Sequence, residues 1–204
     1  MSHVGRCRAL SRGFRRPLPL LFFRPLQHGN DFLTRDKPLR GSAVRDARRR
    51  SLVPVRLCPS CHGLGAQLRK GDAPEIGFAP IKRVDKHDFF SMWDKQLTVL
   101  HWHNDVVGLP AEGQLLSRSS STKVQAFRLG SALGMQFHLE VCGSLLDEWL
   151  DEPSMVKDLK AAGGSKSQLR EQFAQYDQLL QPLAEQVFSG FAARCNSYAQ
   201  TLNK

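Results

Sequence analysis

The chain has 204 residues, 41% of them hydrophobic, and a formal net charge of +10. This length accommodates one α/β domain with a buried core, alone or with a tail. The sequence holds no run of 18 apolar residues, and its five cysteines are odd in number and widely scattered. These features argue against a transmembrane helix and a secreted disulfide framework, so we expect a cytoplasmic protein.

The positive charge is confined to the start of the chain. Residues 1–52 carry 13 Lys+Arg against 3 Asp+Glu, whereas residues 53–204 carry 16 of each. Arginine and proline are frequent in residues 1–52, and no helical or strand period persists there. We interpret this segment as a basic stretch that is disordered or foreign to the fold, for example through a shifted reading frame, rather than as a targeting peptide. The neutral remainder gives no support for nucleic-acid binding.

Residues 53–204 are predicted to form one domain of strands followed by helices. Residues 64–70 are predicted to open a helix. Short β-rich stretches bounded by glycine or proline predict the strands, which are residues 53–57, 75–84, 97–103, 115–118, 124–128 and 133–138.

The end of the chain is predicted to be helical. Apolar residues step by three or four positions from Leu169 to Leu202. Pro182 is predicted to split this stretch into two helices, and residues 163–165 (GGS) to mark the break before them. Strands in the middle with helices before and after them indicate an α/β layered sheet.

The pentad QFHLE (residues 136–140) contains the strongest candidate for catalysis. His138 and Glu140 are two positions apart, so on an extended segment both side chains point to one side. Glu140 can accept the Nδ1 proton of His138, fix its tautomer and stabilise the imidazolium, as in the base and orienter of an activated nucleophile. The alternative is a solvated surface pair. The apolar residues before His138 favour the catalytic interpretation, because catalytic side chains commonly sit where a buried strand emerges.

Four blocks of the sequence belong together: GLGAQL, EIGFAPI, VLHWHNDVVGLP and AFRLGSALGMQFHLEV. In combination they resemble the class I glutamine amidotransferases, in particular their GMP-synthase-like members. AFRLGSALGMQFHLEV is similar to the closing strand, which usually ends Q-F-H-P-E, and VLHWHNDVVGLP to a segment H-W-H-x-D-x-x-x-L-P. EIGFAPI resembles E-I-G-W-x-P-V, and GLGAQL resembles the end of the nucleophile turn G-x-C-L-G-A-Q-L. The blocks follow the family's order and cover roughly residues 53–204. The resemblance implies a flavodoxin-like, three-layer α/β fold whose N-terminal part is truncated or irregular.

The resemblance also implies a reaction and the residues that carry it. In the family a cysteine attacks the carboxamide of glutamine, and glutamate and ammonia result. A synthetase subunit or domain receives the ammonia. His138 and Glu140 match the catalytic pair of the family. Gln67, His103 and Asp105 match positions close to the substrate glutamine.

The chain departs from the family pattern at the nucleophile. Gly63 stands where the cysteine is expected, and Cys61 lies two residues too early on a sharp turn. The backbone N–H of Leu64 matches one oxyanion donor, but no counterpart of the upstream glycine-rich loop is present. Leu139 replaces the usual proline, which predicts a looser geometry in the catalytic pair. We therefore expect glutamine hydrolysis to be very low or absent; the alternative is a non-catalytic, amidotransferase-like binding or regulatory subunit.

Two cysteines also raise the possibility of a metal or haem site. Cys58 and Cys61 have the spacing of a zinc knuckle, and His101 and His103 would complete a Cys2His2 set, but the usual histidine spacing is absent. Residues 58–62 (CPSCH) match the spacing for covalent haem, which needs an oxidising compartment and an axial partner. We rank both below the amidotransferase interpretation and expect no bound metal or cofactor.

Overall fold

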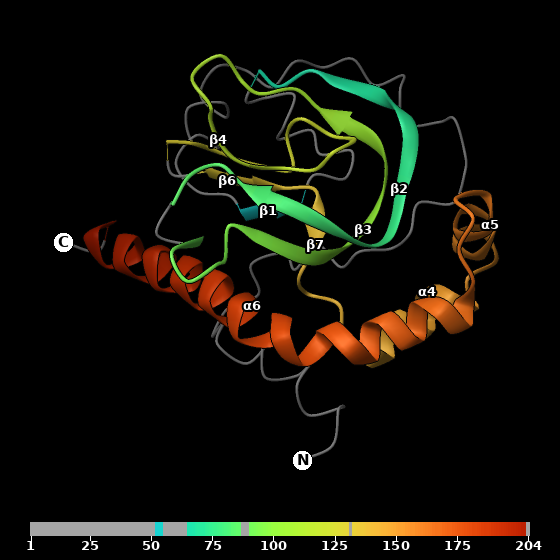
Figure 1. The fold of residues 1–204 in the computed structure, drawn as a ribbon. Helices are drawn as coiled ribbons and strands as arrows, with labels where there is room; N and C mark the ends of the chain where they lie inside the picture. Colours follow the sequence, from blue (N-terminus) through green and yellow to red (C-terminus); the bar gives the residue numbers. More distant parts are fainter. Residues whose placement is uncertain (1–51, 55–64, 87–89, 131, 203–204) are drawn as a thin grey trace.

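The computed structural model describes residues 52–54, 65–86, 90–130 and 132–202 (Figure 1). Its helices are α4 (Gly143–Asp151), α5 (Pro153–Ala161) and α6 (Lys166–Leu202). Its strands are β1 (Leu52–Pro54), β2 (Leu68–Arg83), β3 (Gln96–Val107), β4 (Gln114–Arg118), β5 (Ala126–Leu129), β6 (Ala132–Met135) and β7 (Phe137–His138). The described chain is therefore a mixed α/β fold, as the sequence predicted.

All seven strands belong to one sheet, in the order β1-β6-β5-β4-β2-β3-β7. The β1–β6 pair is parallel, and the other pairs are antiparallel. β2 and β3 are the longest strands, and Figure 1 shows them as a curved ribbon that bends around the shorter ones. The pairing of Glu75 with His103 lies within this ribbon, so both side chains project from the same face.

Most predicted strands are present, but the predicted helix near residue 64 is wrong where it can be checked. Leu68 pairs with Val107 and Lys70 with Asp105, so this part of the chain is the start of β2. Cross-strand pairing with β3 has overridden the local sequence preference, which is common in strands. Of the predicted first strand, residues 53 and 54 belong to β1, and residues 55–57 lie outside the described part.

The C-terminal stretch is one helix rather than the two that were predicted, because Pro182 lies inside α6. Proline removes one helical hydrogen bond and bends the axis. The axis of α6 changes direction along its length (Figure 1). The helix continues because buried residues on both sides of Pro182 hold it against the core, namely Leu169 before it and Ala184 and Val187 after it.

The start of α6 agrees with the predicted break. Gly163 has a φ of 80°, which glycine adopts without strain. The Ser165 hydroxyl accepts a hydrogen bond from the Gln168 N–H at 3.2 Å, so Ser165 caps the helix. No helix among the described residues is both long and apolar enough to cross a bilayer.

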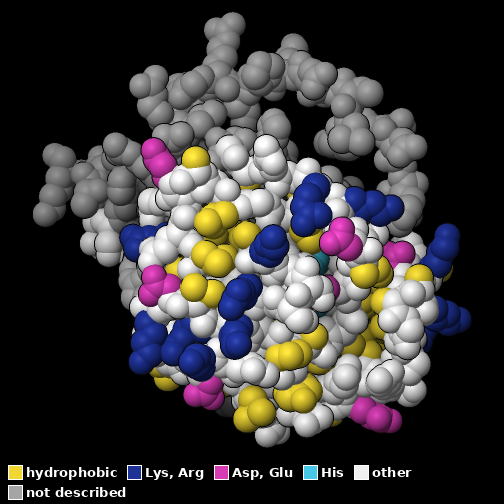
Figure 2. Space-filling view, turned by 45° about the horizontal axis from the view of Figure 1, so that its top comes forward, with side chains coloured by type: hydrophobic (Ala, Val, Ile, Leu, Met, Phe, Trp, Pro, Cys, Tyr) yellow, Lys and Arg dark blue, Asp and Glu magenta, His cyan; other side chains and the backbone are white. Residues whose placement is uncertain are grey.

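The helices cover one face of the β2–β3 ribbon. Leu100 and Trp102 of β3 pack with apolar residues of α4, α5 and the start of α6: Leu146, Trp149, Leu150, Met155, Leu159 and Leu169. His101 and His103 alternate with Leu100 and Trp102 along β3, so their side chains face away from these helices. Figure 2 shows another aspect of the surface, where lysine, arginine and acidic side chains intermingle and a small area of histidine surface lies among them.

The packing of Gly134 against Phe127 gives a stability prediction. The two residues are partners across β5 and β6, and a Cβ on Gly134 would come within 2.5 Å of the fully buried Phe127 ring. We expect Gly134→Ala to lower the free energy of unfolding by about 1–3 kcal/mol, the usual cost of overpacking. Denaturant unfolding measures this. Gly143→Ala is the matched control, since the nearest atom to its added Cβ lies at 4.0 Å. Equal stability of the two variants would show that the Phe127 ring does not restrict the side chain at position 134.

Candidate functional site

His138 and Glu140 form a close pair at the end of β7. The Nδ1 atom of His138 lies 2.6 Å from Oε1 of Glu140, and the His138 side chain is 2% exposed. The two side chains thus meet as their spacing predicted, while their catalytic role stays a prediction. A pair this close fixes the imidazole: Nδ1–H donates to the carboxylate, so Nε2 is the nitrogen that can exchange a proton with a reacting group.

Leu139 tightens this pair instead of loosening it. Its backbone N–H donates to Oε2 of Glu140 at 3.0 Å, so each carboxylate oxygen has its own donor. Proline has no N–H and could not make this bond. The expectation that Leu139 would loosen the geometry is therefore wrong in this structure, because the substitution supplies a donor.

The environment keeps the Glu140 carboxylate ionised. Burial raises the pKa of Glu140, but the charge and hydrogen bond of His138, with backbone N–H groups, outweigh it and hold the pKa below its ordinary value. An ionised carboxylate accepts the His138 proton and stabilises the imidazolium. The pair can therefore handle protons for a nucleophile placed near Nε2.

The aromatic contacts of His138 place it on the helix side of β3. Its ring meets Trp149 edge-on, with centroids 5.1 Å apart, and Trp149 in turn meets Trp102 at 5.3 Å. The register agrees, since His138 is the partner of Leu100, which points the same way as Trp102. Trp149 of α4 therefore packs against the His138 ring on the helix side of β3.

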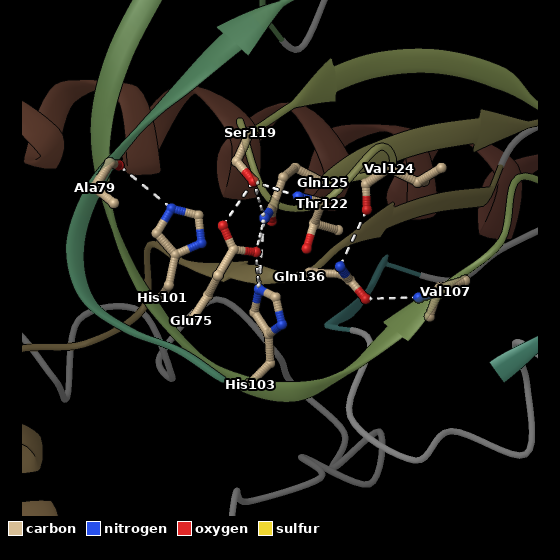
Figure 3. A network of polar contacts seen from close by, with 10 residues as sticks. All are labelled: Glu75, Ala79, His101, His103, Val107, Ser119, Thr122, Val124, Gln125 and Gln136. Carbon is tan, nitrogen blue, oxygen red and sulfur yellow. Dashed lines mark hydrogen bonds and ion pairs between the residues drawn. The ribbon is translucent and has the colours of Figure 1, made fainter. Parts of the chain in front are cut away.

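A second polar group lies on the other face of β3, around Glu75 of β2. Nε2 of His103 is 3.3 Å from Oε2 of Glu75, and the rings of His101 and His103 meet with centroids 5.8 Å apart. Nε2 of His101 lies 3.3 Å from the carbonyl oxygen of Ala79. Figure 3 shows the three side chains converging between β2, β3 and the loop before β5.

Glu75 is held by neutral donors as well as by the histidines. The Ser119 hydroxyl donates to Oε1 at 2.6 Å and the Gln125 amide to Oε2 at 2.8 Å (Figure 3). Burial raises the pKa of Glu75, but hydrogen bonds from Ser119 and Thr122 and the charges of the histidines bring it below its ordinary value. Burial lowers the pKa of His101 to about 4, so its imidazole is neutral near pH 7.

The structure does not bring all the predicted site residues together. His103 faces Glu75, on the opposite side of β3 from His138, so these two histidines do not line one pocket as expected. Asp105 is half-buried near the end of β3, and Gln67 is exposed. Three further predicted positions, Cys61, Gly63 and Leu64, lie outside the described residues, as does Cys58 of the zinc alternative.

Three polar residues of this region, the half-buried Glu75 and the buried Gln125 and Gln136, were not predicted as site residues. Glu75 was seen only as part of a motif, although pairing residues 75–84 with 97–103 as a hairpin would have set it opposite His103. Gln125 holds Glu75, and no local pattern marks it. Gln136 accepts from the Val107 N–H at 2.9 Å and donates to the Val124 carbonyl at 3.1 Å (Figure 3). It joins β3 to the segment before β5.

Comparisons with known proteins agree with this architecture. No family model matches the chain. The chain is 33% identical over 81 residues to YfeJ, a glutamine amidotransferase-like protein of Salmonella typhimurium, covering 38% of this chain and 34% of YfeJ. It is 35% identical, again over 81 residues, to a glutamine-hydrolysing GMP synthase subunit from Sulfolobus acidocaldarius, covering 38% of this chain and 43% of that protein. The matches thus span well under half of these relatives.

Solved structures extend the likeness to the fold. A glutamine amidotransferase from Thermotoga maritima superposes with a TM-score of 0.60 at 25% identity, over 65% of this chain and 57% of that one. An amidotransferase from Methylobacillus flagellatus gives 0.55 at 20% identity, over 66% and 58%, which supports the fold alone. The predicted fold class is thereby confirmed, and the chain is similar to class I glutamine amidotransferases in fold and in an 81-residue stretch of sequence.

Proposed function

We propose that this protein is an amidotransferase-like chain that retains the proton-handling half of glutamine hydrolysis and lacks the nucleophile. The observation that supports the proposal is the His138–Glu140 pair, in which a buried imidazole lies 2.6 Å from a partly exposed carboxylate, together with glycine at position 63. Glutamine is the ligand that the family relationship suggests. The geometry of the pair supports a family-type role, because the Nδ1–H bond to Glu140 leaves Nε2 as the nitrogen that can exchange a proton with a reacting group.

The two halves of the reaction have different requirements. A thiolate must attack the carboxamide carbon, ammonia must leave with a proton, and water must then hydrolyse the thioester. Nε2 of His138 can serve the proton transfers, with Glu140 stabilising the imidazolium. Glycine at position 63 provides no sulfur, so the first bond cannot form there. Hydrolysis is therefore very low or absent unless Cys61 takes over.

A non-catalytic role follows from the same reasoning. A domain that binds glutamine without consuming it can serve in regulation or binding within a larger assembly. The similarity to a GMP synthase subunit supports a synthetase as the partner. The partial coverage of that relative leaves the identity of this partner as part of the proposal.

The Glu140 carboxylate gives a prediction on acid stability. A folded-state pKa below the ordinary 4.5 means that Glu140 stabilises the fold above that pH, and that this contribution is lost as the pH falls through the lower, folded-state pKa. We expect Glu140→Gln to lower the free energy of unfolding at pH 7 by about 1.5–3 kcal/mol, and the difference from the parent to shrink below about pH 4.5. Urea unfolding at several pH values measures it.

Glu148→Gln serves as the control for acid stability, because Glu148 is exposed on α4. It should leave both the stability and its pH dependence close to those of the parent. A Glu140→Gln variant whose deficit stays constant down to pH 3 would show that the carboxylate charge is not what stabilises this pair.

Restoring the nucleophile tests the proposal on activity. Ammonia release from glutamine should be at background for the parent chain and should rise in Gly63→Cys made together with Cys61→Ser. The gain should disappear when His138→Gln is added, because the thiolate then lacks its base. Loss of a nucleophile in a hydrolytic triad can cost about 10⁶ in kcat, so even partial restoration is measurable.

Two outcomes of the ammonia assay would contradict the proposal. One is turnover by the parent at about 1–10³ s⁻¹, ordinary for enzymes, that is abolished by Cys61→Ser. The other is a folded Gly63→Cys variant that binds glutamine and releases no ammonia, since the missing thiolate would then not be the limiting defect.

A further inference from the structure

We propose that Glu75, His101 and His103 form a binding site for a divalent transition-metal ion, and that zinc is the ion that fits it. One nitrogen or oxygen from each residue can be chosen so that the three atoms all lie within 4.8 Å of one another. The site is separate from the His138–Glu140 pair and does not depend on the glutaminase proposal. It also differs from the Cys2His2 set considered from the sequence, because a carboxylate replaces the two thiolates.

The pleat of the ribbon produces this arrangement. His101 and His103 are two apart on β3 and so project from one face, and Glu75 is the cross-strand partner of His103 on β2. The three ligands therefore come from paired positions of two long strands rather than from mobile loops. A site built on strands holds its ligands more accurately than one built on loops.

The spacing suits a small metal ion. Zinc binds imidazole nitrogen and carboxylate oxygen at about 2.0–2.2 Å, which puts neighbouring ligands of a tetrahedral site about 3.3–3.5 Å apart. His103 Nε2 and Glu75 Oε2 are 3.3 Å apart already. Three protein ligands of the His2Glu type leave the fourth position for water, as catalytic zinc sites do.

His101 is prepared as a ligand by its own hydrogen bond. The Ala79 carbonyl can only accept, so Nε2 of His101 carries the proton and the lone pair is on Nδ1. Nδ1 is buried, has no hydrogen-bond partner, and points toward Glu75 in Figure 3. A ligating histidine commonly donates its other N–H to a backbone carbonyl, which fixes the ring and raises its basicity. Full burial of an acceptor without a partner is costly, and a metal ion would satisfy it.

The surroundings complete a polar shell around the ligands. Ser119 and Gln125 orient the Glu75 carboxylate, as outer groups orient ligating carboxylates elsewhere. Oε1 of Gln125 is buried without a hydrogen-bond partner and could accept from a metal-bound water. Two imidazoles with one carboxylate suit zinc and its neighbours and disfavour calcium and magnesium, which prefer oxygen ligands.

Zinc titration of the full chain tests the site. The chain would carry Cys58→Ser and Cys61→Ser, which remove the rival thiolates, and would be treated with a chelator first. Calorimetry with zinc chloride near pH 7.5 should give one ion per chain. X-ray absorption of the zinc-loaded chain should show nitrogen and oxygen at about 2.0–2.2 Å with imidazole scattering, and no sulfur at about 2.3 Å.

Matched variants connect the binding to these residues. Mutating a residue that only orients a metal ligand typically costs about 10–100-fold in metal affinity. Glu75→Gln keeps the size of the side chain and removes a ligating carboxylate, so it should weaken zinc binding by more than that. The exposed Glu148→Gln should bind as the parent does. Absence of stoichiometric zinc, sulfur in the absorption spectrum, or equal affinity of a folded Glu75→Gln variant would each overturn the proposal. The X-ray absorption spectrum is recorded on the chain that retains Glu75, so it tests the ligand set even if the Glu75→Gln variant fails to fold.

Discussion

The antiparallel pairing of β2 with β3 determines which polar side chains of this domain can meet. It runs from Leu68 opposite Val107 to Lys82 opposite Gln96, with an irregularity between Lys70 and Glu75. Because side chains alternate along a strand, this register sends Leu100 and Trp102 toward the helices and His101 and His103 to the other face. A slip of one residue would exchange the two sets and bury the histidines under α4. The helix packing and both polar groups thus depend on one register.

The His138–Glu140 pair at the end of β7 depends indirectly on the pairing of β2 with β3. β7 is short and is held by pairing with β3, and its His138 rests on Trp149, which rests on Trp102. The carboxylate of Glu140 then receives Nδ1–H of His138 on one oxygen and the Leu139 N–H on the other. The amidotransferases that this chain resembles usually have proline at the position of Leu139, which here donates its N–H, so the pair is well fixed.

Local pattern was sufficient for much of the fold. Alternating residues in 75–84 and the β-rich composition of 97–103 predicted the two long strands, and the apolar period from Leu169 onward predicted α6. Pattern failed where long-range packing decided the outcome. Leu68 joined β2 because β3 was available to pair with it, and α6 ran through Pro182 because Ala184 and Val187 are buried beyond it. Neither contact can be read from a few neighbouring residues.

The candidate site was predictable only in part, for the same reason. The two-residue spacing of His138 and Glu140 predicted their meeting, and they do meet, although β7 ends at His138 and Glu140 lies just beyond it. The meeting of Glu75 with His103 requires the hairpin register, and that of Gln125 with Glu75 requires the whole order of the sheet. The resemblance to the amidotransferases identified His103 as a candidate without showing which face of β3 it occupies. The structure separates it from His138 and associates it with Glu75.

We propose that this domain keeps an acid–base pair and has lost its nucleophile, and covalent labelling distinguishes this from an intact enzyme. A glutamine analogue with a chloromethyl ketone in place of the carboxamide would alkylate a thiolate held near His138, with loss of chloride. Mass spectrometry of the parent chain should find no stoichiometric adduct, and the Gly63→Cys variant should carry one adduct on residue 63. Stoichiometric, glutamine-protected labelling of Cys61 in the parent would contradict the account, since a working nucleophile would then be present.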